Sequence, residues 1–255
     1  MFVLMMLGGD VLWLSLTAVS LVGVFELYRV MKMEKTMMGT LGYLGVLAWW
    51  ALVARLGISQ AAIPVLVVLL ILELAVFVFS YPKYQAEQLF ASIFGVIYVA
   101  IMLSFLYLVR ENIPHGKWLV WLVIIASWGS DTFAYFVGVT LGKHKLAPIL
   151  SPKKSIEGAV GGVLGAALLG TVFGLVLGSF VEMPSSAPGL FAVIGGVGSI
   201  VSQIGDLAAS GIKRCFQVKD YGTLIPGHGG ILDRFDSVII TAPIVYYLAA
   251  IMIKL

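Results

Sequence analysis

The chain has 255 residues, of which 60% are hydrophobic and only 11% are charged, and its formal net charge at neutral pH is +3. With a mean hydropathy of +1.05, this composition excludes a water-soluble globular fold. An open sheet would leave backbone groups unpaired in lipid, and the apolar runs are too continuous for an outer-membrane barrel. We therefore predict an all-α, polytopic transmembrane helix bundle.

Eight apolar stretches approach the ~20 residues that a helix needs to cross the hydrocarbon core. In chain order, the predicted spans are 10–28, 40–56, 61–80, 88–109, 118–141, 157–181, 189–209 and 237–253. The apolar segment Met1–Leu7 is too short to span, and we interpret it as the end of a truncated N-terminal span. We expect one integral-membrane domain, 1–255, with N-terminal spans in 1–117 and the chemistry-bearing half in 118–255.

Two glutamates lie in or near the N-terminal spans. Glu26 is close to a predicted membrane boundary, beside Tyr28 and Arg29, and snorkelling or pairing with a basic group explains it adequately. Glu73 lies deeper in its span, and the sequence names no partner for it.

Asp131 lies in SWGSDTFAYFVG, well inside a predicted span. A carboxylate at that depth costs roughly 2.5–3.5 kcal/mol on insertion scales, so we expect a polar cavity or a cation beside it. Structural pairing with a basic side chain is the alternative. Function is favoured because Ser127, Ser130 and Thr132 add hydroxyl groups nearby.

The segment GKHKLAPILSPKKSIEG, 142–158, places four lysines ahead of a helix that we predict to begin near Ser155. These are Lys143, Lys145, Lys153 and Lys154. A helix N-terminus flanked by lysines is a ready phosphate site. Lysines that only fix membrane topology would look similar. The glycines that follow, spaced three or four apart, favour close helix packing over a ligand role.

The span that follows ends in SQIGDLAASGIKR. On a helix, Asp206, Ser210 and Lys213 fall at i, i+4 and i+7, so one face carries an acid, a hydroxyl and an amine. Beyond it, 210–237 combines both signs of charge with the turn PGHGG, whose glycines can expose backbone N–H groups to an anion. His228 in this turn is a ligand, a proton shuttle or an ordinary polar loop residue.

Asp233 and Asp236 are three residues apart at the start of the last predicted span, so they point the same way. Helix capping alone would account for them. Carboxylates that converge from different helices, however, supply the hard oxygen ligands that Mg²⁺ prefers.

The distribution of basic residues predicts the orientation. If the loop 29–38 is cytoplasmic and the spans alternate, four basic residues lie outside and the other 12 of the 16 lie inside. The four outside are Arg55, Arg110, Lys117 and Lys254. This asymmetry places both charge-rich loops on the cytoplasmic side. The single cysteine, Cys215, excludes an internal disulfide and suits a reducing compartment.

Together, the polar segments resemble the signature of phosphatidate cytidylyltransferases, also called CDP-diacylglycerol synthases. The run that carries the resemblance is Ser210-x-x-Lys213-Arg214-x4-Lys219-Asp220-x-Gly222-x2-Ile225-Pro226-x-His228-Gly229-Gly230-x2-Asp233-Arg234-x-Asp236. The blocks SDTFAYFVG, LGKH and SPKKSIEGAVGG are also similar to that family. The match covers Ser127 to Ser237 and is highly specific, whereas the N-terminal spans match only in being apolar.

The resemblance implies that CTP and phosphatidate give CDP-diacylglycerol and pyrophosphate with Mg²⁺, and it leaves room for another divalent or a monovalent cation. It implies Asp206 and Asp233 as leading metal ligands, followed by Asp236 and Asp131. Asp206 and Asp233 are also the expected catalytic residues, with Lys219 and His228. The expected substrate-binding residues are Asp131, Lys153, Lys154, Ser155, Ser210, Lys213, Arg214, Gly229, Gly230 and Arg234.

By the same resemblance we expect a bacterial inner (cytoplasmic) membrane location, with the active site facing the cytoplasm. Membrane lipids are the expected surroundings, a homodimer is plausible, and no nucleic-acid partner is expected. No protein nucleophile is needed, because the phosphate monoester of the lipid can attack CTP itself.

Two other functions compete. Polyprenol or dolichol kinases share DxxAYxxG and KSxEG-like blocks, but the full HGGxxDRxD run argues against them. A transporter with buried acids as ion sites would show inverted repeats and broken helices in matched halves, and the sequence shows neither. A purely structural membrane protein would not concentrate both signs of charge between Lys213 and Asp236.

Overall fold

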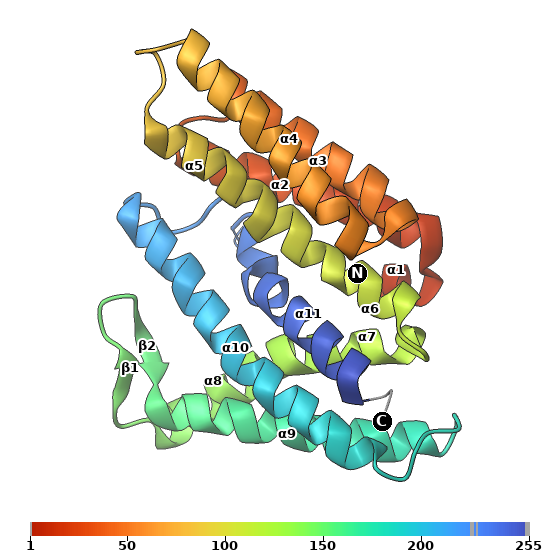
Figure 1. Cartoon of the computed structure of the whole chain (residues 1–255). Helices are drawn as coiled ribbons and strands as arrows, with labels where there is room; N and C mark the ends of the chain where they lie inside the picture. The colour runs from red at the N-terminus through yellow and green to blue at the C-terminus, as the bar shows by residue number, and fades with distance from the viewer. Residues whose placement is uncertain (1, 225–226, 228, 253–255) are drawn as a thin grey trace. The chain divides into compact units, whose positions relative to one another are not determined.

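The computed structural model describes residues 2–224, 227 and 229–252 and is mainly helical (Figure 1). Within these residues, eight helical segments are long and apolar enough to cross a membrane. They are Gly9–Val30, Met37–Leu56, Ile58–Phe79, Ala86–Asn112, Gly116–Leu141, Ile156–Gly178, Ala187–Cys215 and Leu232–Met252. All eight predicted spans are found, which confirms the polytopic all-α bundle and defines an integral membrane protein.

The first half of the chain forms α1 to α6. Helix α1 (Phe2–Leu7) is separated from α2 (Gly9–Val30) by Gly8, and both Gly8 and the first residue of α2, Gly9, have positive φ values, of 68° and 53°. This left-handed backbone is accessible to glycine at little cost, so the chain turns here instead of continuing one helix. Next come α3 (Met37–Leu56) and α4 (Ile58–Phe79). The fourth span is α5 (Ala86–Gly95), the π-helical turn η1 (Val96–Ile101) and α6 (Met102–Asn112).

The second half contains the remaining spans and one small sheet. Helix α7 (Gly116–Ile124), the π-helical turn η2 (Ile125–Gly129) and α8 (Ser130–Leu141) make one span. Strands β1 (Lys145–Ala147) and β2 (Ser151–Ser155) pair antiparallel, with Lys145 opposite Ser155. The helices α9 (Ile156–Gly178), α10 (Ala187–Cys215) and α11 (Leu232–Met252) complete the chain.

Two helices differ from the predicted spans at the ends that carry charge. Helix α10 runs on to Cys215, and α11 already begins at Leu232. The predicted spans stopped at 209 and started at 237, because hydropathy marks the apolar part of a helix and not its polar end. As a consequence, Asp206, Ser210 and Lys213 share one continuous helix, as their spacing predicted.

Backbone packing divides the chain into two compact units. One consists of Met1–Tyr107 and Cys215–Phe235, and the other of Leu108–Arg214 and Asp236–Leu255. The loop between α10 and α11, 216–231, carries much of the signature and is called the signature loop below; it groups with the N-terminal spans. Lys213 and Asp236, which also belong to the signature, group with the C-terminal spans.

In the first unit, hydrogen bonds of buried polar side chains connect the apolar helices. Glu73 on α4 is fully buried and accepts a hydrogen bond from Ser92 Oγ of α5. The Ser92 hydroxyl also lies 3.0 Å from the Met38 carbonyl oxygen, and the Tyr28 hydroxyl donates to the Ser92 carbonyl at 2.5 Å. The partner of Glu73, which the sequence did not name, is thus a serine on a neighbouring helix.

In the second unit, α8 and α9 pack closely through small residues. A Cβ atom at Gly158 would lie 2.7 Å from the Ala134 carbonyl oxygen and 3.1 Å from the Gly138 Cα. The helices can approach this closely only because these positions carry no side chain. The packing role predicted for the glycines of α9 is confirmed.

Candidate active site

Three carboxylates from three helices approach one another in the second unit. Asp131 is in the first turn of α8, Asp206 is on α10, and Asp236 is near the start of α11. The three side chains are close enough to interact electrostatically. Their mutual repulsion makes this cluster unfavourable unless cations neutralise it.

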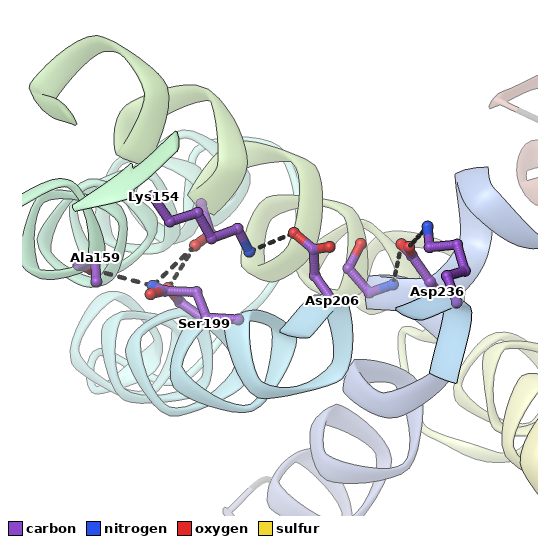
Figure 2. Close-up of polar contacts among 9 residues, drawn as sticks. Lys154, Ala159, Ser199, Asp206 and Asp236 are labelled. Atoms are coloured by element: carbon purple, nitrogen blue, oxygen red, sulfur yellow. Dashed lines mark hydrogen bonds and ion pairs between the residues drawn. The ribbon is translucent and has the colours of Figure 1, made fainter. Parts of the chain in front are cut away.

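Two lysines supply part of that neutralisation. Lys154 on β2 forms an ion pair with Asp206, and Lys213 Nζ lies 4.0 Å from Asp236 Oδ2. Figure 2 shows Asp206 drawn between Lys154 and Asp236. Lys213 and Asp236 are each only 8% exposed, and buried charges at such positions require opposite charges nearby.

The acids Asp131 and Asp206 open onto a cavity of about 490 Å³. This volume falls in the range of about 300–1,000 Å³ that is usual for small-molecule sites. Lys145, Lys153 and Lys154 line the same cavity, together with Ser155 and Gln203. Because both carboxylates and ammonium groups are on its walls, the cavity can accept phosphate groups and a cation together.

A polar network supports the helices behind this cavity. Ser130 and Ser199 are fully buried, and their hydroxyl oxygens are 2.7 Å apart. The Gln203 amide donates to the Ala159 carbonyl at 3.1 Å and lies 3.3 Å from Ser199 Oγ. These contacts fix α8, α9 and α10 relative to one another near Asp206, as Figure 2 shows.

The strand pair places the lysines at the start of α9. Ser155 is the residue that caps this helix, because its hydroxyl accepts from the Gly158 backbone N–H at 3.1 Å. Glu157 accepts from the Lys143 backbone N–H at 3.1 Å and pairs with His144. The predicted helix start is confirmed. The β-hairpin is a feature that the sequence did not predict.

The signature loop is held within the first unit. Asp233 Oδ2 accepts from the backbone N–H groups of Tyr221 and Gly230, at 2.8 and 2.9 Å. Glu26 accepts from those of Ile231 and Leu232, at 3.1 and 2.8 Å. Glu26 is only 3% exposed, so it is not the snorkelling residue that the sequence suggested. In the sequence, Glu26 stands out only as an acid in an apolar span. That observation could not identify a partner 205 residues away.

The remaining predicted site residues are spread over both units. Lys153, Arg214, Lys219 and Arg234 are exposed, Ser210 is half-buried, and Gly229 has a φ of 80°. His228 lies outside the described residues. Among the residues that are described, no three Asp, Glu, His or Cys side chains come close enough to enclose a metal ion. The metal-binding and substrate-binding roles therefore remain predictions.

The fold and the cavity define a class: an integral membrane protein with a polar site suited to anionic ligands. The cytidylyltransferase family matches residues 1–252. The phosphatidate cytidylyltransferase of Bacillus subtilis (strain 168) is 32% identical over 245 residues, which are 92% of this chain and 87% of that protein. The protein of the same name from Staphylococcus haemolyticus (strain JCSC1435) is 31% identical over 248 residues, which are 94% of this chain and 90% of that protein.

A third relative matches a shorter part more strongly. The phosphatidate cytidylyltransferase of Staphylococcus saprophyticus is 41% identical over 150 residues, which are 59% of this chain and 55% of that protein. The chain belongs to the cytidylyltransferase family. The family predicted from the signature is confirmed, and the similarity extends beyond the signature into the N-terminal spans.

Proposed function

We propose that this chain transfers CMP from CTP to phosphatidate, giving CDP-diacylglycerol and pyrophosphate. The observation that carries this proposal is similarity to a phosphatidate cytidylyltransferase over 92% of the chain. In the reaction, a phosphate oxygen of phosphatidate forms a bond to the α-phosphorus of CTP. The bond between that phosphorus and the oxygen bridging to the β-phosphate breaks, and pyrophosphate leaves with the electron pair.

The residues of the cavity suit this chemistry because both substrates are anions. Lys145, Lys153 and Lys154 can offset the repulsion between the two phosphate groups and hold the triphosphate in line with the attacking oxygen. The amines also stabilise the charge that develops on the leaving pyrophosphate. The lipid phosphate is itself the nucleophile, so the chain needs only to bind, orient and neutralise.

A divalent cation suits the donor chemistry of the acidic cluster, although the described carboxylates would have to move closer together to enclose it. Asp206, Asp131 and Asp236 offer hard oxygen donors and repel one another, and Asp233 is the further ligand that the signature implies. Mg²⁺ held by such residues supplies charge neutralisation at the phosphates and at the leaving group. Because Lys154 already pairs with Asp206, metal binding would require Asp206 to share or exchange this partner.

The site is proposed to face the cytoplasm of a bacterial cell, since most basic residues lie in loops assigned to that side. CTP would then arrive from water and phosphatidate from the surrounding leaflet. A polyprenol or dolichol kinase is less well supported, because two relatives that match 92% and 94% of the chain are phosphatidate cytidylyltransferases.

The test uses purified protein in detergent and two preparations of CTP, one radiolabelled at the α-phosphate to detect CDP-lipid and one at the γ-phosphate to detect a phosphorylated polyprenol. Phosphatidate and undecaprenol are offered separately, each with Mg²⁺ and with excess chelator, and the lipid products are separated by chromatography. We expect labelled CDP-lipid from phosphatidate, one pyrophosphate per product, and no product with chelator. Phosphorylation of undecaprenol without CDP-lipid would refute the proposal. Asp206→Asn serves as the inactive control for a contaminating enzyme.

A further inference from the structure

Two residues on α2 form hydrogen bonds with the signature loop, one before and one after its glycine-rich turn. Glu26 Oε1 accepts from the Ile231 N–H at 3.1 Å, and Oε2 accepts from the Leu232 N–H at 2.8 Å. One turn along the same helix, Arg29 Nη2 donates to the Tyr221 carbonyl oxygen at 3.0 Å. An N-terminal span thus contacts the backbone on both sides of the glycine-rich turn.

The loop is shaped to receive the Glu26 carboxylate. A Cβ atom at Gly222 or at Gly230 would collide with Glu26. A Cβ atom at Gly222 would also lie 2.9 Å from the Gly230 Cα. The two glycines therefore bring separate parts of the loop against one buried acid, and any side chain at either position would displace it.

The same bonds determine where Asp233 lies. Ile231 and Leu232 immediately precede it, and both donate their N–H groups to Glu26. Asp233 in turn accepts hydrogen bonds from the backbone N–H groups of Tyr221 and Gly230. The backbone of the loop is therefore held both by Asp233, from the same segment of the chain, and by Glu26 on α2. The N–H of Leu232, the first residue of α11, and that of Ile231 just before it have no acceptor within the helix, and a carboxylate from α2 satisfies both.

We propose that Glu26 is a positioning residue for the transfer reaction. From an N-terminal span, it fixes the backbone of Gly230–Leu232 and thereby the direction of the Asp233 side chain. This inference rests on the proposed function and on the role that the signature implies for Asp233. Glu26 touches neither reacting group; it acts through the loop.

Glu26→Gln tests this proposal because the amide has nearly the same size as the carboxylate but only one oxygen. One of the two backbone N–H groups would then face an NH₂ group, so only one of the two hydrogen bonds can form. Glu73→Gln is the matched control: Glu73 is also buried in the first unit, but it accepts a hydrogen bond from Ser92 on α5 and forms none with the described residues of the loop. Glu26→Asp keeps two acceptor oxygens on a shorter stem.

Two measurements are made on each purified variant. The first is steady-state CDP-lipid formation over a range of Mg²⁺ concentrations. The second is deuterium exchange of backbone amides in the peptide 221–232, which needs no turnover. For Glu26→Gln we expect kcat to fall about 10- to 100-fold, as for a misplaced catalytic group, with a higher Mg²⁺ requirement and faster exchange. Glu26→Asp should be intermediate, and Glu73→Gln should match the wild type in both.

The inference is overturned if Glu26→Gln keeps wild-type kcat, Mg²⁺ dependence and exchange. Equal losses in Glu26→Gln and Glu73→Gln would also overturn it, because they would indicate general destabilisation of the N-terminal spans. If Glu26→Gln does not fold, Gly222→Ala replaces it, since its methyl group displaces the same carboxylate from the loop side. A wild-type chain that forms no CDP-lipid would instead refute the proposed function, while the exchange measurement would still show whether Glu26 holds the loop.

Discussion

Lys154 on β2 and Asp206 on α10 form an ion pair at the wall of the cavity. Their side chains are 26% and 27% exposed, so the pair is neither a solvated surface contact nor a fully desolvated one. It joins the lysine-rich hairpin to the acidic cluster. Substrate phosphates and a metal ion would compete for these same two groups.

Lys154→Met should raise the KM for CTP by about tenfold, which corresponds to about 1.4 kcal/mol of lost binding. The substitution keeps the apolar stem and removes the charge that faces the cavity. Lys143→Met is the control, since Lys143 lies in the same segment but does not line the cavity. If the lysines only fixed membrane topology, both variants would behave alike in the CTP titration.

Asp206→Asn should lower kcat by about 100-fold or more, the scale seen when an electrostatic group is removed from a preorganised site. The amide is a poor ligand for Mg²⁺ and leaves Lys154 without its counter-charge. Glu182→Gln, an exposed acid between α9 and α10, should retain activity. Wild-type turnover by Asp206→Asn at ordinary Mg²⁺ concentrations would remove this residue from the proposed mechanism.

Asp233 can be tested for two roles at once, because one of its oxygens accepts two backbone N–H groups. Asp233→Asn keeps an acceptor oxygen for the loop but loses the charge, whereas Asp233→Ala loses both. If Asp233 binds metal, both variants should fall by about 100-fold, and the asparagine variant should recover partly at high Mg²⁺. A role restricted to loop closure predicts an active asparagine variant and an inactive alanine variant. Titration of both variants with Mg²⁺ distinguishes these outcomes.

The sequence predicted those features that depend on local chemistry. Eight spans follow from stretches of apolar residues, and the start of α9 follows from Ser155 before a run of small and apolar residues. The shared face of Asp206, Ser210 and Lys213 follows from helical periodicity alone. The family follows from the spacing of the polar residues in 210–237.

The features that the sequence did not predict depend on partners far along the chain or on weak local signals. Glu26 lies more than 200 residues from Ile231, so its hydrogen bonds could not be inferred from its neighbours. The partner of Glu73 is on a different helix. The β-hairpin has strands of three and five residues and contains lysines and prolines instead of alternating apolar residues. Only the folded chain shows that it carries Lys154 to Asp206.

Gly158→Ala tests whether close packing of α8 and α9 shapes the cavity. The new methyl group would lie 2.7 Å from the Ala134 carbonyl oxygen and 2.9 Å from Ser155 Oγ, so the helices must separate or the Ser155 cap must break. Overpacking of this kind costs about 1–3 kcal/mol, which should lower Tm by several degrees for a chain of this size. The same separation should raise the KM for CTP, because Gly158 and Ser155 both line the cavity.

Gly178→Ala on the same helix has nothing within 4 Å of its new methyl group and should leave Tm and KM unchanged. Thermal unfolding in detergent and CTP titration of both variants measure the effect, and equal behaviour of the two would show that the α8–α9 contact does not control the site.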